Sequence, residues 1–300
     1  MDAADDDYGA KELKVNELKH SEQAAVWSQH AGQWSRVGPP LKPSPEDTAL
    51  TLSALQVVFD TTHGPCRIAV LGVTPELVQL PWPQRVTLDA FDHSADMIAR
   101  VWQPHPTVHS SVHEADWRAL PLDAGTLHAA VGDGSLNVLP DLDQYPAVLG
   151  ELHRVLVAQS RVVIRCFIRP DVAEPVPALV AAVLGGQVGS FHALKWCLAM
   201  TLAGVSGASV AVADIHEVFE ASFPSRSALS EATGWPQEQI DTIDAYRGSP
   251  TRYTFPTLVQ MREQCERWFE VVTVAYGTYE LADRYPTLTL ARKNAGGNGE

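Results

Sequence analysis

Glycines, carboxylates and hydroxyls recur between residues 71 and 137 in short segments that suit a bound nucleoside. The first segment is Leu71-Gly72-Val73-Thr74-Pro75. Gly72 lets the backbone approach a ligand closely, and Thr74 is placed to cap a helix that opens at Pro75. Backbone N–H groups at that helix start remain free to face a ligand. The same residues also make an ordinary strand-to-helix turn, so this segment by itself does not decide the function.

The second segment is Asp92-His93-Ser94, about 20 residues beyond Gly72. An acid at this distance is placed to accept hydrogen bonds from both hydroxyls of a ribose. Ser94 is a capping residue for the helix that follows, and Met97 in its first turn can pack on an adenine ring. Asp89 is the rival acid, but it falls inside the preceding strand.

Two further segments continue the pattern. Glu114-Ala115-Asp116-Trp117 offers a carboxylate to the amine of an adenine and an aromatic ring to cover the base. Gly132-Asp133-Gly134-Ser135-Leu136-Asn137 places two glycines around an acid, which indicates a backbone close to a ligand. Each of them is also compatible with a plain loop, so the functional interpretation requires that all four segments meet.

The elements around these segments predict that they do meet. Five short apolar runs are expected to be strands: Arg67–Val73, Val86–Phe91, Val108–Glu114, Leu127–Gly132 and Arg161–Ile168. Helices are expected between them, most clearly Asp143–Val157, whose apolar residues recur every three or four positions. Alternating strands and helices predict a parallel sheet with helices on both faces. Ligands bind such sheets beyond the carboxyl ends of the strands, where the four segments lie.

The rest of the chain departs from this alternation. Val172–Ser249 is expected to be helical, including Ser190–Leu202, and to be an insertion over the end of the sheet. Phe255–Trp268 is expected to be a helix, and Phe269–Tyr276 with Pro286–Ala291 a hairpin. We therefore expect tails without fixed structure over 1–14 and 294–300, a helical cap over 15–62, a nucleoside-binding core over 63–169, a helical insertion or lid over 170–250, and a helix and hairpin that complete the core over 251–293.

Composition narrows the class of protein. The formal net charge is −14 and the 22 lysines and arginines are scattered, which disfavours DNA or RNA as a partner. No apolar run is long enough to span a bilayer, and the start MDAADDDYGAKELK lacks the apolar stretch of a signal peptide. The four cysteines form no CxxC pair, which argues against a zinc site and a disulfide framework. We expect a cytoplasmic protein with no nucleic-acid or membrane partner, and nothing indicates an oligomer.

The motifs together resemble those of a known family. The series LGVTPEL, AFDHSADMI, EADWRALPL, AAVGDGSLNVLP and LGELHRVL, followed by a strand, resembles class I S-adenosyl-L-methionine (AdoMet)-dependent methyltransferases over about Arg67–Ile168. FEVVTVAYGTYELADRYPTLTLAR looks like the closing hairpin of that family, and WSRVGPPLKPSPED like the lead-in helix of some bacterial small-molecule members. The resemblance implies an α/β fold: a Rossmann-like seven-stranded sheet, mostly parallel with a C-terminal antiparallel hairpin, helices on both faces and a helical cap.

The resemblance also assigns ten residues to the cofactor, AdoMet. The resemblance places Leu71, Gly72 and Thr74 at the methionine end of AdoMet and Asp92 at the ribose. It places His93, Met97, Asp116 and Trp117 around the adenine. Asp133 and Gly134 would lie by the amino-acid moiety and the methyl group. The sequence departs from the family at two places. The usual G-x-G-x-G of the first loop keeps only Gly72, and VAQS replaces the glycine pair before the fifth strand.

The implied activity is methyl transfer to oxygen or nitrogen of a small molecule, whose identity the residues do not reveal. A base is often needed, and histidine is a usual choice because its pKa is near neutral. His192 and His216 in the insertion are candidates, as is Tyr246 beside Arg247, although each is also compatible with a structural role. No carboxylate–histidine cluster with ligand spacing is evident, so no metal site is expected.

The insertion and the helices before Phe59 are expected to close over the strand ends and form the acceptor pocket. The insertion is rich in aromatic residues, which favours a small, partly apolar acceptor, although the same residues also serve to bury the insertion against the body: Phe191, Trp196, Phe219, Phe223 and Trp235.

Other functions remain open. A protein of the same fold that holds AdoMet or its product without catalysis is one, because the first loop has lost glycines. A nicotinamide-dependent oxidoreductase is another, since strand, Gly72, helix and then Asp92 also suit a dinucleotide, but the fingerprint G-x-G-x-x-G is absent. A purely structural or interaction domain is the third.

Overall fold

The computed structural model describes residue 32 and residues 34–293. The expected tails over 1–14 and 294–300 lie outside the described residues, as does the cap segment 15–31. The part of the cap that is described consists of a short 3-10 helix, η1 (Trp34–Arg36), and helix α2 (Pro45–Thr61). Ser44 caps α2 as its sequence predicts, because its hydroxyl accepts from Asp47 N while the Asp47 carboxylate accepts from Ser44 N.

Seven strands form one sheet in the order β3-β2-β1-β4-β5-β9-β8. Their bounds are β1 (Cys66–Leu71), β2 (Val86–Asp92), β3 (His109–Glu114), β4 (Leu127–Asp133), β5 (Leu156–Arg165), β8 (Phe269–Ala275) and β9 (Thr287–Arg292). Strands β1 to β5 are parallel, and β9 pairs antiparallel with both β5 and β8. The predicted fold class is confirmed. The chain runs outward from β1 to β3 and returns to β4, so the order reverses between β1 and β4.

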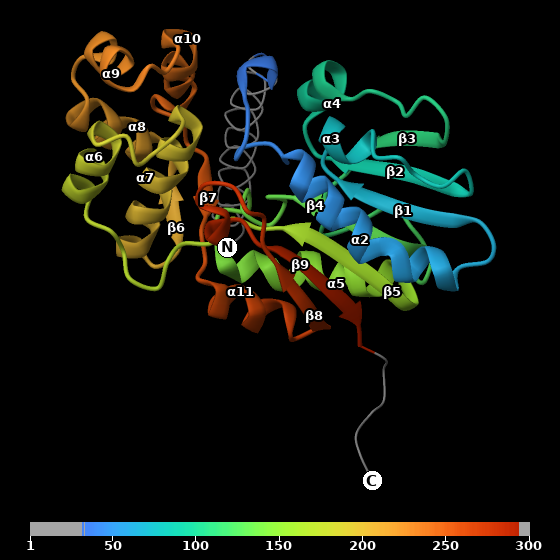
Figure 1. Cartoon of the computed structure of the whole chain (residues 1–300). Helices are drawn as coiled ribbons and strands as arrows, with labels where there is room; N and C mark the ends of the chain where they lie inside the picture. Colours follow the sequence, from blue (N-terminus) through green and yellow to red (C-terminus); the bar gives the residue numbers. More distant parts are fainter. Residues whose placement is uncertain (1–31, 33, 294–300) are drawn as a thin grey trace, which may run out of the picture.

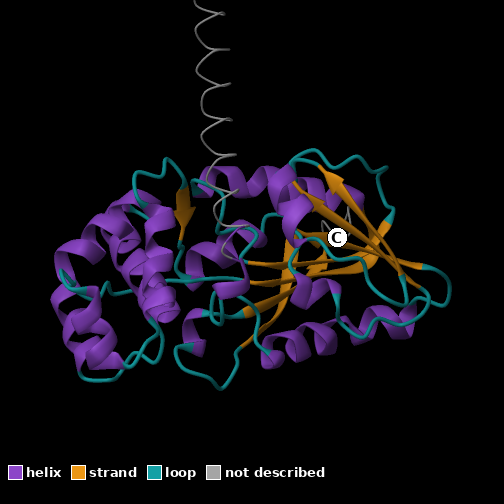
Figure 2. Cartoon of the chain, turned by 90° about the horizontal axis from the view of Figure 1, so that it is seen from above, coloured by secondary structure: helices purple, strands orange, loops and turns teal. Residues whose placement is uncertain are grey.

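Helices cover both faces of this sheet (Figure 2). Helices α2 and α3 (Pro75–Val78) lie on one face, where Leu55 and Leu77 join the buried residues of the strands. Helices α5 (Tyr145–Val155) and α11 (Leu258–Cys265) lie on the other face with Leu149 and Met261. Helix α4 (Ala95–Val101) follows β2. The three-and-four spacing of α5 is confirmed, because its apolar residues are the ones that are buried.

A helical lobe stands at the end of the sheet toward which the arrowheads of β1 and β5 point (Figure 1). It contains α6 (Val176–Leu184), α7 (Phe191–Ser206), α8 (Val212–Ser222), α9 (Arg226–Thr233), α10 (Gln237–Ile240) and η3 (Asp241–Tyr246). A two-stranded antiparallel sheet of β6 (Ser209–Ala211) and β7 (Arg252–Thr254) completes it. These two strands were not predicted, since three residues are too few to show an alternating pattern.

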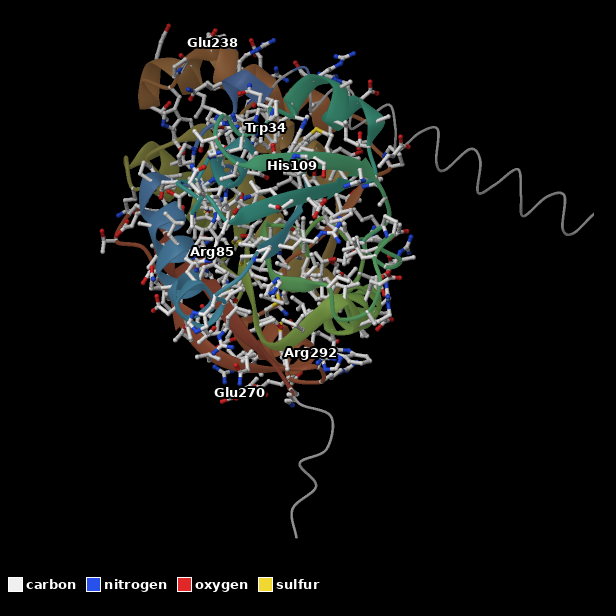
Figure 3. All side chains as sticks on the ribbon, turned by 90° about the vertical axis from the view of Figure 1, so that its right-hand side faces the viewer. Trp34, Arg85, His109, Glu238, Glu270 and Arg292 are labelled. Carbon is white, nitrogen blue, oxygen red and sulfur yellow. The ribbon has the colours of Figure 1, made fainter. Side chains whose placement is uncertain are left out.

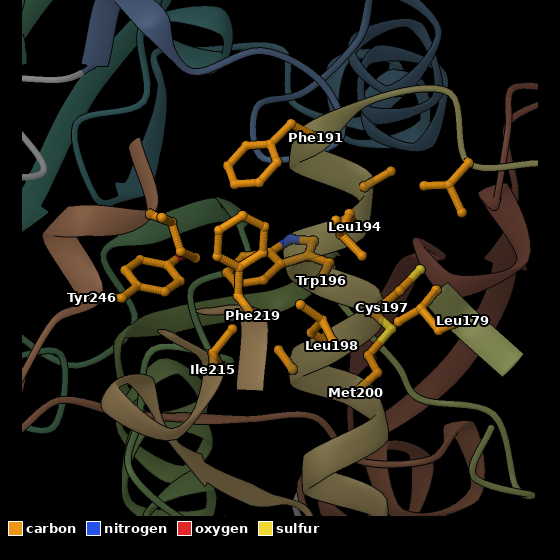
Figure 4. Packing of buried hydrophobic residues seen from close by; sticks show 14 of the residues in the cluster. Leu179, Phe191, Leu194, Trp196, Cys197, Leu198, Met200, Ile215, Phe219 and Tyr246 are labelled. Atoms are coloured by element: carbon orange, nitrogen blue, oxygen red, sulfur yellow. The ribbon is translucent and has the colours of Figure 1, made fainter. Parts of the chain in front are cut away.

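The lobe has a hydrophobic core of its own, built along α7 (Figure 4). Phe191 and Phe219 meet edge to face with ring centroids 5.4 Å apart, and Phe223 and Trp235 belong to the same cluster. Most of the aromatic residues singled out in the insertion therefore bury the lobe itself. Trp196 is the exception, because it also lines a cavity described below.

Two other short 3-10 helices, η2 (Leu142–Gln144) and η4 (Ala282–Arg284), connect longer elements. The helix expected over Phe255–Trp268 is shorter than predicted, since it begins only after Thr257, whose hydroxyl accepts from Gln260 N in a capping box. Across the described part of the chain, no helix combines the length and the apolar character needed to cross a bilayer.

Candidate functional site

A cavity lies where the carboxyl ends of β1, β2 and β4 meet the helical lobe. Three parts of the chain line it. The loops after the strands supply one wall, the lead-in turn supplies Trp34, Val37 and Leu41, and the lobe and its flanks supply Lys195, Trp196, Thr242, Tyr246, Tyr253 and Phe255. Trp34 lies toward the end of the molecule that carries Glu238, whereas Glu270 and Arg292 lie at the opposite end (Figure 3).

All but one of the residues predicted to bind AdoMet line this cavity: Leu71, Gly72, Thr74, Asp92, His93, Met97, Trp117, Asp133 and Gly134. The exception is Asp116. Its carboxylate accepts from the Arg118 guanidinium at 2.6 Å, and this hydrogen bond lowers the pKa of Asp116. The structure therefore gives no support to the assignment of Asp116 to the adenine, because Arg118, which follows in the same motif, engages its carboxylate.

The first loop turns at Gly72, whose φ of +97° lies in the left-handed region that favours glycine. The predicted side-chain cap by Thr74 does not form. Only the carbonyl of Thr74 takes part in the helix start, accepting from Leu77 N and Val78 N at 3.1 Å each. Because the hydroxyl of Thr74 makes no capping hydrogen bond, it is left for the cavity that Thr74 lines.

Asp92 ends β2 as a nearly buried carboxylate, with 8% of the residue exposed. Its Oδ1 accepts from Ser94 N at 2.9 Å, and Ser94 Oγ in turn accepts from Met97 N as the cap of α4. Burial raises the pKa of Asp92 to about 6, although the backbone N–H groups of Ser94 and His93 oppose the shift. In the described chain no lysine or arginine pairs with Asp92, so its carboxylate keeps acceptor capacity for hydroxyl donors in the cavity.

The rival acid Asp89 is bound differently. Its carboxylate accepts from Arg67 Nε at 2.6 Å and from the hydroxyl of Ser111 at 2.9 Å. Asp89 does not belong to the cavity wall that the structure describes. Its acceptor atoms are used within the sheet, which leaves Asp92 as the acid at the end of β2.

Asp133 lines the cavity at the end of β4, but its carboxylate is engaged by a buried arginine. Arg165 Nε and Nη2 donate to it at 2.5 and 3.1 Å. Arg165 also donates to the carbonyl of Pro40 at 2.9 Å, and its Nη1 lies 3.4 Å from Asp47 Oδ2. Asp133 thus lines the cavity with a carboxylate that Arg165 already engages, and its role toward a ligand stays a prediction.

The backbone after Asp133 is shaped for close approach. Gly134 has a φ of +60°, and a Cβ at this position would overlap the ring of Phe167. Asn137, which the sequence motif contained without a role, holds the next part of the loop. Its amide donates to the carbonyls of Phe167 and Thr254 at 2.7 Å each and accepts from Phe167 N at 3.0 Å. The loop is therefore tied to the end of β5 and to β7.

The catalytic candidates differ in where they lie. Tyr246 lines the cavity, and burial raises the pKa of its hydroxyl. His192 is not part of the described cavity wall; its Nε2 lies 3.1 Å from the carbonyl of Arg36, and burial lowers its pKa to about 4. Its Nδ1 is buried without a partner in the described chain. A histidine so placed supports the lead-in turn and is not positioned as a base in the cavity.

Lys195 is a cavity residue that the sequence did not single out. It lies on α7 and lines the cavity, with only 3% of the residue exposed. The signal was present, since Lys195 is the one lysine in the apolar stretch SFHALKWCLAMTL. A buried lysine without a carboxylate partner costs free energy, and such a residue in a cavity is a candidate for a functional role.

The structure also brings together a group with metal-ligand chemistry that the sequence did not reveal. His216 and Glu220 lie one turn apart on α8, and Asp244 approaches them from η3. Arg226 donates to Glu220 Oε1 and to Asp244 Oδ1, the latter at 2.7 Å. Both carboxylates therefore already have a cationic partner, and the cluster lies outside the described cavity wall.

Comparison with known proteins identifies the fold. No protein-family model matches the chain, and no curated protein sequence matches it. Among solved structures, a protein from Rhodobacter sphaeroides provisionally described as a Zn-dependent alcohol dehydrogenase is similar with a TM-score of 0.53 at 14% identity, covering 91% of this chain and 98% of that one. This likeness concerns the fold alone and assigns no activity.

Methyltransferases are found at lower similarity. The N-methyltransferase NodS from Bradyrhizobium japonicum, in complex with S-adenosyl-L-homocysteine, has a TM-score of 0.44 at 9% identity and covers 85% of this chain and 91% of that one. Magnesium protoporphyrin IX methyltransferase from Synechocystis has a TM-score of 0.43 at 14% identity and covers 82% of each chain. At these scores, neither structure decides the function of this chain.

Proposed function

We propose that the chain binds AdoMet and is a methyltransferase that acts on oxygen or nitrogen of a small-molecule acceptor. One observation carries the proposal. The strand-end segments of a Rossmann-like sheet converge on one cavity, and Asp92, a desolvated carboxylate with which no lysine or arginine of the described chain pairs, ends the second strand there. A carboxylate at this place in such a sheet is suited to the two hydroxyls of a ribose.

The other cavity residues fit the rest of AdoMet. His93, Met97 and Trp117 supply rings and a flexible apolar side chain beside Asp92, as an adenine requires. The backbone at Gly72 and Gly134 and the hydroxyl of Thr74 suit the polar amino-acid end. When bound, AdoMet supplies a methyl group activated on a sulfonium sulfur.

The acceptor side of the cavity is built by the lead-in turn and the lobe. Its wall is largely aromatic, with Trp196, Tyr246 and Phe255 among the lining residues. Apolar walls with few polar groups suit a small molecule and not a polymer. Tyr246 stays a candidate for a contact with the acceptor, whereas His192 does not line the described cavity and contacts the carbonyl of Arg36 instead.

Calorimetry with AdoMet tests the proposal. We expect wild-type protein to bind AdoMet and Asp92→Ala to bind it at least about tenfold more weakly, since a charge-assisted hydrogen-bond pair contributes about 1.5–3 kcal/mol. Asp116→Asn is the matched control and should bind as wild type does, because Asp116 is engaged by Arg118. Wild-type protein that fails to bind AdoMet refutes the proposal, and an Asp92→Ala variant with unchanged affinity refutes the role of Asp92.

A second function, AdoMet binding without catalysis, is favoured by one observation. Only Gly72 remains of the glycines expected in the first loop. Methyl transfer from labelled AdoMet to an extract of small metabolites separates the two functions, because a binder labels nothing. A parallel titration with NAD tests the oxidoreductase alternative, for which we expect no binding because the loop lacks the glycines that admit a pyrophosphate.

A further inference from the structure

Lys195 presents an amine to the lobe side of the cavity from the second turn of α7. Its Nζ donates to Thr242 Oγ1 at 3.1 Å, and the Thr242 hydroxyl itself donates to the carbonyl of Gln239 at 2.6 Å. Thr242 therefore only accepts from the amine and does not supply a charge. Within the described residues, no carboxylate forms an ion pair with Lys195. The amine thus has hydrogen-bonding capacity that the described residues leave unused.

Burial favours the neutral form of Lys195, although its Nζ also lies over the rings of Phe191 and Tyr246, 5.6 and 5.3 Å from their centroids, where a cation is stabilised. Burial lowers the pKa of Lys195 to about 7. Its titratable neighbours are Tyr246 and Tyr253 in the cavity wall and His192 on the same helix. Burial raises the pKa of both tyrosines and lowers that of His192 to about 4, so all three are uncharged near pH 7. A lysine in this setting is able to accept a proton from a bound molecule.

Aromatic rings surround the same part of the cavity. Trp196 meets Tyr253 and Phe255 edge to face, with centroids 5.7 and 5.2 Å away, and Phe167 lies 5.3 Å from Trp196. The indole N–H of Trp196 is buried without a hydrogen-bond partner in the described chain. Figure 4 shows Trp196 on α7 with Tyr246 across from it on the neighbouring segment. Walls of this kind suit a planar apolar body with one polar end.

We propose that the methyl acceptor is a small planar molecule with an acidic hydroxyl, a phenol or an enol, and that Lys195 Nζ binds this hydroxyl and removes its proton. The O–H bond breaks, its electron pair stays on the oxygen, and the proton converts the amine to an ammonium ion. The oxyanion that results is the nucleophile for methyl transfer. A carboxylic acid fits less well, because it arrives already ionised and presents two oxygens to a single amine.

This inference rests on the proposed function for the fate of the oxyanion, but its test does not need AdoMet. The probes are para-nitrophenol, whose ionised form is yellow, and para-nitroanisole, in which a methyl group replaces the hydroxyl hydrogen. We expect wild-type protein to bind para-nitrophenol at least about tenfold more tightly than para-nitroanisole and to increase its yellow fraction. Lys195→Met should abolish this preference. Lys293→Met is the matched control and should keep it, since Lys293 donates to the Glu266 carbonyl on the surface.

Three outcomes overturn the inference. They are equal affinity of wild-type protein for the two probes or binding of neither, a Lys195→Met variant that keeps the preference, and tighter binding of para-nitrobenzoate than of para-nitrophenol. Loss of AdoMet binding with an intact Lys195-dependent preference would instead refute the proposed function alone.

A measurement on wild-type protein covers the case in which Lys195→Met does not fold. The neutral amine should attack para-nitrophenyl acetate: the nitrogen bonds to the acetyl carbon, the ester C–O bond breaks, para-nitrophenolate leaves, and the amine proton goes to solvent. Peptide mapping should find acetylation at Lys195, and excess para-nitrophenol should suppress it. An unmodified Lys195, or acetylation that para-nitrophenol does not suppress, contradicts the inference.

Discussion

Replacing Arg165 by methionine should destabilise the protein strongly, because one guanidinium serves two buried carboxylates. Arg165 contacts Asp133 at the end of β4 and Asp47 on α2, and it donates to the carbonyl of Pro40. These residues belong to three separate parts of the chain. Methionine keeps much of the volume and removes only the charge and the donors, so the variant isolates the polar contribution.

The size of the stability loss depends on the two buried carboxylates that lose their cationic partner. The side chains of Asp133 and Asp47 are 5% and 2% exposed, and removing one partner of a buried pair costs about 3–5 kcal/mol. Asp47 keeps hydrogen bonds from Ser44 and Tyr279, whereas in the described chain only Arg165 donates to the Asp133 side chain. Most of the cost therefore falls on Asp133, and we expect a loss of about 3 kcal/mol.

Urea unfolding followed by tryptophan fluorescence measures this loss. Arg161→Met is the matched control, four residues earlier in β5; its side chain donates only to carbonyls of its own turn in the described structure, and we expect a change within about 0.5 kcal/mol. Adding Asp133→Asn to Arg165→Met should recover part of the stability, because it removes the uncompensated charge. A loss below about 1 kcal/mol for Arg165→Met would refute the reasoning.

Three further predictions concern the cavity. Because burial raises the pKa of Asp92 to about 6 and ribose hydroxyls donate to the ionised form, AdoMet affinity measured by calorimetry should rise between about pH 5 and pH 7, and Asp92→Asn should flatten the profile. Gly134→Ala should cost more than about 1 kcal/mol in urea unfolding and weaken AdoMet binding, whereas Gly125→Ala, with positive φ but open space, should cost less and leave binding unchanged. The pKa of Lys195 in the folded protein is about 7, below the ordinary 10.5, so the unfolded chain takes up this proton first as the pH falls. The free energy of unfolding of the wild-type protein should therefore drop between about pH 10 and pH 7. Lys195→Met should remove that drop.

The fold was predictable because its signals are local and repeated. Each strand of the parallel core has its own apolar run, and α5 shows its buried face in the spacing of its residues. The place of Asp92 followed from the same regularity, since a strand end in a parallel sheet faces the ligand side whatever the details of packing. Helix α2 also begins at a local signal, the capping box of Ser44 and Asp47.

What the sequence did not predict depends on contacts between distant segments. The Asp133 carboxylate is used by Arg165, 32 residues away, and nothing in the motif around Asp133 indicates this. Lys195 becomes part of the cavity only because the lobe that contains α7 stands at the strand ends, which no local pattern encodes. The assignment of Asp116 to the adenine gains no support from the structure for the opposite reason, since its partner Arg118 is only two residues away.

The lead-in turn lines the cavity, and residues outside the cavity hold this turn in place. Residues Trp34 and Leu41 form one wall, and polar contacts hold the chain around them at both ends. Arg165 binds the carbonyl of Pro40, and His192 lies at hydrogen-bond distance from the carbonyl of Arg36. With a pKa of about 4, His192 is neutral in the physiological range, so its ring can donate to that carbonyl without bringing a charge into the lobe. The sequence suggested His192 as a base, whereas in the structure its ring contacts the carbonyl of Arg36. Through that carbonyl His192 contacts the lead-in turn, of which Trp34, Val37 and Leu41 line the cavity.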